Sequence, residues 1–144
     1  MTGWRVFGRI SAFVVALTTS TPPQVTGAPV LQQDPDAKQL RNPVASTPES
    51  VAAGAQTYAK VCAACHGANG NGDGKLAEAT AAYGARPSDL TDNVWDHGSS
   101  DGEIFVVIRD GIGPDFNMPG FKGRLSDAEI WSVVTYVKSL GVKR

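Results

Sequence analysis

Both cysteines of this 144-residue chain and one of its two histidines fall within five consecutive residues, Cys62-Ala63-Ala64-Cys65-His66. Two thiols separated by two small residues on one helical turn can reach the two vinyl groups of a haem and form thioethers. The next residue is then carried beneath the porphyrin plane, where a neutral imidazole nitrogen is a good iron ligand. The pattern therefore predicts covalent attachment of one haem c through Cys62 and Cys65, with His66 as the proximal ligand.

The same residues fit three other kinds of site less well. A thioredoxin-like dithiol follows a strand inside a βαβ unit, and nothing before Val61 has the pattern of a strand. A zinc site normally has four protein ligands, and His97 is the one histidine left to complete such a set. A disulfide between Cys62 and Cys65 would close a very short loop and leave His66 without a role.

The N-terminal residues have the order of a secretory signal peptide. Arg5 and Arg9 come before an apolar run over residues 10–17, and a polar stretch with small residues follows. The run is too short to cross a bilayer. We expect cleavage after Gly27, so that residues 1–27 are removed and the mature chain is exported to the periplasm without a stable membrane span.

The mature chain is expected to be mildly acidic. Residues 1–27 contain two arginines and no acidic residue, so 11 basic residues remain against 14 acidic ones, a net charge of −3. With no basic run, such a chain has no electrostatic surface for nucleic acid or anionic lipid. Residues 28–46 contain three prolines and no sustained apolar periodicity, which predicts an extended, poorly ordered leader before a single domain over residues 47–144.

Three segments of that domain are predicted to be helices. Thr47 is a good N-cap and Pro48 suits the first helical position, so the first helix is expected to lead into the cysteine motif. Ser100 and Ser126 each begin a capping box and open the second and third helices. A weaker helical turn is expected within residues 76–83, and no segment alternates like a strand, so the predicted fold is all-α. The residues expected to end the second and third helices are Gly111 and Gly141.

On these residues the chain resembles the class I c-type cytochromes, across residues 47–144. In that family the helix carrying the attachment motif crosses the last helix at close range. Gly54 and Tyr58 match the glycine and aromatic residue of the first helix, and Tyr136 matches the aromatic residue of the last. A glycine lets the two backbones approach while aromatic side chains fill the groove. The resemblance implies the cytochrome c fold, with three main helices and loops around one haem.

The resemblance also implies a distal iron ligand on a loop between the last two helices. The sequence Asn117-Met118-Pro119-Gly120-Phe121 stands there, and Met118 is the only methionine apart from the initiator. A lone methionine usually fills a core, but this one lies in a proline-glycine loop, where Pro119 can fix the backbone. Met118 is therefore expected to be the sixth ligand, and the rival is His97.

Two further residues are assigned through the resemblance. A proline after the motif presents its carbonyl to the second nitrogen of the proximal histidine in that family, and Pro87 is the candidate here. Such a hydrogen bond would fix the histidine tautomer and tune the iron. Trp95 is expected to approach a haem propionate, although a packing role explains it equally well.

The implied function is single-electron transfer. An iron with both axial positions filled by protein gains and loses an electron more readily than it binds oxygen or peroxide. The resemblance thus implies an electron carrier and not an enzyme, a monomer that meets redox protein partners briefly at an exposed haem edge. Two alternatives stay open: an electron-accepting cytochrome subunit of a periplasmic dehydrogenase, and a haem enzyme or ligand sensor whose sixth ligand dissociates. The residues expected on the exposed rim are Ala63, Ala64, Pro119 and Phe121.

Overall fold

The computed structural model describes residues 1, 3, 34–82, 86–92, 94–113 and 118–141. The predicted signal peptide lies outside the described residues except for Met1 and Gly3, so it stays a prediction. Among the helices in the described part of the chain, none has the length and apolar character needed to cross a bilayer.

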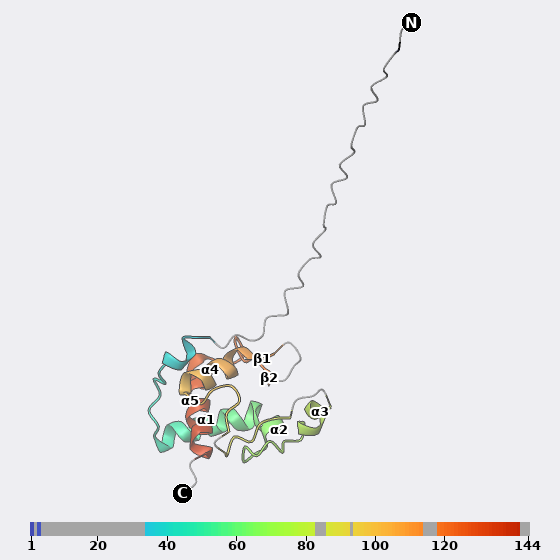
Figure 1. Ribbon diagram of the computed structural model, residues 1–144. Helices are drawn as coiled ribbons and strands as arrows, with labels where there is room; N and C mark the ends of the chain where they lie inside the picture. The colour runs from blue at the N-terminus through green and yellow to red at the C-terminus, as the bar shows by residue number, and fades with distance from the viewer. Residues whose placement is uncertain (2, 4–33, 83–85, 93, 114–117, 142–144) are drawn as a thin grey trace.

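The described residues form a small helical domain with loops between its helices (Figure 1). This confirms the prediction of an all-α fold. In chain order the elements are η1 (Ala37–Gln39), α1 (Pro48–Val61), α2 (Ala63–His66), α3 (Ala77–Ala81), α4 (Asp101–Asp110), β1 (Gly111–Ile112), β2 (Met118–Pro119) and α5 (Asp127–Leu140).

The predicted caps begin the three main helices. Thr47 precedes α1, and its side chain and that of Ser50 cap each other's backbone N–H. Ser100 before α4 and Ser126 before α5 make the same reciprocal contacts with the glutamate three residues later. Each box satisfies backbone donors that a helix start leaves free, which is why these short patterns locate helix starts reliably.

The predicted crossing of the first and last helices is present, and α1 lies directly against α5 (Figure 1). Gly54 is buried at the crossing, where a Cβ atom on it would collide with the backbone carbonyl of Ser132. Beside it the rings of Tyr58 and Tyr136 lie 5.0 Å apart between centroids, at 57°. The close approach of the two backbones therefore depends on the missing side chain of Gly54.

The core continues from this crossing to α4 through α5. Trp131 stacks on Phe105 of α4, with ring centroids 4.0 Å apart and planes at 16°. Val133 and Val134 are almost fully buried between these contacts. The helix α5 is thus packed against two neighbours and forms the centre of the domain.

The expectation of a poorly ordered leader is wrong for residues 34–46. The 3-10 turn η1 lies against α4, and Ala37 is only 2% exposed. The Asn42 side chain donates hydrogen bonds to the Thr135 hydroxyl, at 3.0 Å, and to the Trp131 carbonyl, at 3.4 Å. We call residues 34–46 the strap. Its contacts are made with α4 and α5, far along the chain, so no local pattern reveals them. Residues 28–33 lie outside the described part.

A short antiparallel ribbon, which sequence patterning did not predict, follows α4. It pairs Gly111 with Pro119 and Ile112 with Met118. Each strand is two residues long, too short for any alternation of polar and apolar residues. Just after the ribbon, the N–H of Phe121 donates to the carbonyl of Ile108 at 3.0 Å, so this segment, with Met118, is fixed to the end of α4.

Candidate haem site

A cavity of about 410 Å³ opens at the end of α1 that carries the cysteine motif. Its walls come from α1, α2, α4, α5, the ribbon, and the loop between α3 and α4. Volumes of this order are typical of sites for small molecules and cofactors. The residues predicted to attach, ligate or contact the haem, and the rival ligand, all lie in its lining: Cys62, Cys65, His66, Pro87, Trp95, His97 and Met118.

The cysteine motif forms a helical turn that continues from α1. The N–H groups of Cys65 and His66 both donate to the carbonyl of Cys62, at 3.1 and 3.0 Å. This turn places both thiols in the lining of one cavity, and neither is in a disulfide. Burial, and then the nearby Cys65, raise the pKa of the Cys62 thiol to about 11. The thiol is therefore neutral at pH 7.

His66 is held by a backbone carbonyl of the opposite loop. Its Nδ1 lies 3.1 Å from the carbonyl oxygen of Ser88. Burial lowers the pKa of His66, and the bond to Ser88 opposes this shift only in part. A neutral ring with Nδ1 donating to Ser88 leaves Nε2 with a free lone pair, which is the form that ligates a metal.

The assignment of Pro87 as the partner of His66 is wrong by one residue. The acceptor is the carbonyl of Ser88, while the carbonyl of Pro87 lies against Gly72. The loop is fixed in this register by the N–H of Leu90, which donates to the carbonyl of Gly70 at 2.7 Å. Contacts between two loops thus decide which carbonyl faces His66. The sequence of either loop by itself does not predict them.

The glycine-rich segment after the motif also shapes the site, although sequence reasoning gave it no role. The Tyr58 hydroxyl donates to the carbonyl of Gly67 at 2.8 Å. The N–H groups of Gly72 and Gly74 donate to the carbonyls of His66 and Cys65, at 2.9 and 3.0 Å. Gly67 and Gly72 have positive φ values of 81° and 74°, which glycine adopts readily. The repeated glycines are therefore the sequence feature that could have predicted these close turns around the motif.

Met118 and His97, the two candidates for the distal ligand, line the same cavity. Met118 is half-buried and fixed through its pairing with Ile112. His97 is exposed and belongs to the loop before α4. The described residues contain no group of three or more His, Cys, Asp or Glu side chains arranged for a metal ion, so the zinc hypothesis finds no support in them.

The other predicted residues of the site divide between its wall and its rim. Trp95 is half-buried and packs against the core, as a wall residue does. Ala64 and Pro119 are exposed as a docking rim requires. Phe121, expected on the rim, is instead only 5% exposed, because its backbone is bonded to the end of α4 and its ring joins the core.

These residues fit a haem. Two thiols on one helical turn, a neutral imidazole whose second nitrogen is already bonded, and a methionine sulfur all belong to the lining of one largely apolar cavity. Such a donor set suits an iron porphyrin, because an imidazole paired with a methionine sulfur is typical of haem iron in cytochromes c.

Comparison with known proteins gives a family match over most of the domain. A family model described as "Cytochrome C oxidase, cbb3-type, subunit III" matches residues 49–137. The chain is 37% identical over 90 residues to the cbb3-type cytochrome c oxidase subunit FixP of Bradyrhizobium sp. (strain ORS 278), covering 62% of this chain and 27% of the relative. It is also 37% identical over 94 residues to subunit CcoP of Rhodobacter capsulatus, covering 62% of this chain and 29% of that protein. The chain thus spans little more than a quarter of the length of these relatives.

Two solved structures have a similar fold. A reducing HAO-like protein complex of Kuenenia stuttgartiensis, Kustc0457/Kustc0458, matches with a TM-score of 0.58 and 30% identity, over 70% of this chain and 49% of that chain. Cytochrome cL of Methylophaga aminisulfidivorans matches with a TM-score of 0.51 and 22% identity, over 65% of this chain and 57% of that chain, which bears on the fold alone.

Proposed function

The chain belongs to the cbb3-type cytochrome c oxidase subunit III family of c-type cytochromes, and from that premise we propose that it carries single electrons through one haem c. Membership implies that the haem is covalently bound. In this assignment Cys62 and Cys65 would hold the haem through thioethers, and His66 and Met118 would ligate its iron. The observation that carries this assignment is that all four side chains line one cavity of about 410 Å³.

When bound, the haem supplies a reversible one-electron couple at its iron. The chain's own residues would make electron transfer fast and would keep other ligands from the iron. The Ser88 carbonyl holds the His66 ring in one tautomer and orientation, so Nε2 needs little reorganisation. Met118 is held by its pairing with Ile112, and a thioether sulfur favours the reduced state. With both ligands bound, the iron would offer oxygen and peroxide no free coordination site.

We further propose that the electron passes to or from an oxidoreductase to which this domain is attached or docked. The relatives are described as subunits of a cbb3-type oxidase, and the chain corresponds to little more than a quarter of their length. The exposed Pro119 lines the cavity, and the exposed Ala64 stands in the turn that carries Cys65 and His66, so the two offer a contact surface there. A location outside the cytoplasm, with residues 1–27 as a cleaved signal and residues 47–144 as the domain, completes the proposal.

The rival function is that of a haem enzyme or ligand sensor whose sixth position opens. A different alternative concerns the ligand alone: His97 lines the cavity together with Met118, so an iron ligated by His66 and His97 would still make an electron carrier. The carrier and the enzyme or sensor differ in whether a small ligand can bind the iron. A closed His66/Met118 site excludes carbon monoxide at neutral pH, whereas a labile site binds it.

The test is the spectrum of the oxidised holoprotein, with Met118→Ala and His97→Ala as a matched pair. We expect the oxidised parent and His97→Ala to show the weak red sulfur-to-iron band, and their reduced forms to exclude carbon monoxide at neutral pH. Met118→Ala should keep its covalent haem, lose the red band and show a lower midpoint potential, and its reduced form should bind carbon monoxide rapidly.

Two results would contradict the assignment. A parent protein that binds carbon monoxide as fast as Met118→Ala has an open site, and the ligand-binding or catalytic role is then the better account. If Met118→Ala keeps the parental spectrum while His97→Ala changes it, the iron is ligated by two histidines and the carrier operates at a lower potential.

A further inference from the structure

One wall of the cavity is a loop without helix or strand. The described residues 86–92 and 94–100 connect α3 to α4, and Pro87, Trp95 and His97 lie in the cavity lining. The position of such a loop depends on its bonds to neighbouring elements, because it has no regular backbone hydrogen bonds of its own.

The first half of the loop is held by backbone contacts. The N–H of Leu90 donates to the carbonyl of Gly70, and the carbonyl of Ser88 faces the His66 ring. The second half is held differently. In the described part of the chain, no backbone-to-backbone hydrogen bond involves residues 94–99.

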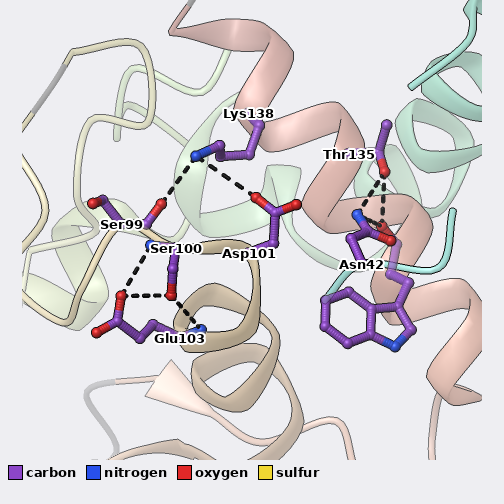
Figure 2. A network of polar contacts seen from close by, with 8 residues as sticks. Asn42, Ser99, Ser100, Asp101, Glu103, Thr135 and Lys138 are labelled. Carbon is purple, nitrogen blue, oxygen red and sulfur yellow. Dashed lines mark hydrogen bonds and ion pairs between the residues drawn. The ribbon is translucent and has the colours of Figure 1, made fainter. Parts of the chain in front are cut away.

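Side chains of two helices hold this second half, as Figure 2 shows. Glu103 of α4 accepts from the backbone N–H of Ser100 at 2.9 Å and from its hydroxyl at 2.7 Å, and its carboxylate lies under Gly98. Lys138 of α5 donates to the carbonyl of Ser99 at 3.0 Å and lies 3.7 Å from the Asp101 carboxylate. The Lys138 bond therefore connects the loop to a helix distant in sequence.

Lys138 stands on the most firmly packed element of the domain. The helix α5 is buried against α1 and α4, and Val133 and Val137 of the same helix line the cavity. We propose that Lys138 is a positioning residue: through the Ser99 carbonyl it holds the segment carrying Trp95 and His97 as a closed wall of the haem cavity. This inference rests on the proposed function, since it assumes that the cavity holds the haem.

The ion pair with Asp101 is not what gives Lys138 this role. The two side chains are 43% and 40% exposed, and exposed ion pairs contribute little to stability. The bond to Ser99 is different, because an ammonium donor meets a carbonyl of a segment that makes no backbone-to-backbone hydrogen bond within the described residues. Its loss would loosen the wall locally and leave the fold intact.

The test compares three variants of the holoprotein by hydrogen exchange and by midpoint potential. Lys138→Met removes the bond to Ser99, and Lys138→Arg keeps a cationic donor. Lys38→Met is the matched control, because Lys38 is exposed on the strap and acts on Glu103 through charge alone.

In Lys138→Met we expect the hydrogen-bonded amides of this segment, those of Val94 and Ser100, to exchange about fivefold faster, the factor that corresponds to a bond worth about 1 kcal/mol. Water reaching the cavity stabilises the more highly charged oxidised state, so the potential should fall further than in Lys38→Met. Lys138→Arg should restore both values.

The inference is overturned if exchange over residues 94–100 is unchanged in Lys138→Met, or if its potential equals that of Lys38→Met. Failure of the proposed function looks different, because a parent protein without covalent haem or without a reversible one-electron couple would show it before any variant is made.

Discussion

Replacing Gly54 by alanine tests the helix crossing on which the domain is built. An added Cβ at this position would lie against the backbone carbonyl of Ser132 and 2.8 Å from the Cβ of Tyr136. Neither neighbour can give way easily, because the carbonyl belongs to the backbone of α5 and the Tyr136 Cβ is fixed to it. The methyl group therefore forces the two helices apart.

Two opposing effects decide the size of the change. Alanine is favoured over glycine inside a helix by about 1 kcal/mol. Overpacking a buried site costs roughly 1–3 kcal/mol, and a collision with rigid backbone belongs at the upper end of that range. We therefore expect Gly54→Ala to lower the free energy of unfolding by about 1–2 kcal/mol, or the melting temperature by about 5–15 °C for a domain of this size.

The assay is equilibrium unfolding of the holoprotein in urea, followed by circular dichroism at helix wavelengths. Ala53→Gly is the matched control, because Ala53 is the exposed neighbour of Gly54 in α1 and its replacement measures helix propensity alone. We expect both variants to be less stable than the parent, although one replaces glycine by alanine and the other replaces alanine by glycine.

The sign of the Gly54→Ala result is decisive. If the crossing were loose, helix propensity would dominate and Gly54→Ala would be as stable as the parent or more so. That outcome, with Ala53→Gly destabilised as expected, would refute the argument that backbone contact at Gly54 sets the approach of α1 and α5.

Three further predictions concern the strap, a helix cap and the attachment of the haem. Asn42→Ala should lower the free energy of unfolding by about 1–2 kcal/mol, because the amide bonds to Thr135 and Trp131 are lost; parental stability in urea would contradict this. The pKa of Glu103 is held below its ordinary value of 4.5, first by the Ser100 side chain and then by the Ser100 N–H. The ionised form therefore stabilises the fold above about pH 4.5, and Glu103→Gln should cost about 0.3–0.5 kcal/mol at pH 7 and progressively less as the pH falls below 4.5; a loss independent of pH would exclude the charge as its cause. Finally, haem should remain with the polypeptide through acidic organic extraction, and replacing either Cys62 or Cys65 should shift the pyridine haemochrome band; extractable haem would refute the thioether assignment.

What could be predicted from the sequence was mostly local. Thr47 with Pro48, and the capping boxes that begin at Ser100 and Ser126, predict the helix starts because each pattern lies within one helical turn. The cysteine motif was readable for the same reason, since both thiols and the histidine belong to a single helical turn. Such patterns need no knowledge of the rest of the fold.

What was missed depends on contacts between distant segments. Asn42 makes its bonds to Thr135 and Trp131 across about 90 residues, so the polar composition of the strap was read as disorder. The partner of His66 moved from Pro87 to Ser88 because the pairing of Leu90 with Gly70 sets which carbonyl faces the ring. A carbonyl's direction follows from the tertiary arrangement, and residue type carries almost no information about it.

The helix α5 joins these distant contacts, and its faces should respond differently to substitution. One face meets Gly54 at the crossing, the next holds the strap through Thr135, and Val133 and Val137 line the cavity. Displacing α5 from α1 moves the cavity lining with it, whereas releasing the strap leaves that lining in contact with α1. Gly54→Ala should therefore shift both the stability and the midpoint potential, and Asn42→Ala should lower the stability alone. If Asn42→Ala shifts the potential as much as Gly54→Ala does, the strap acts on the cavity as well, and this division of the helix into separate faces is wrong.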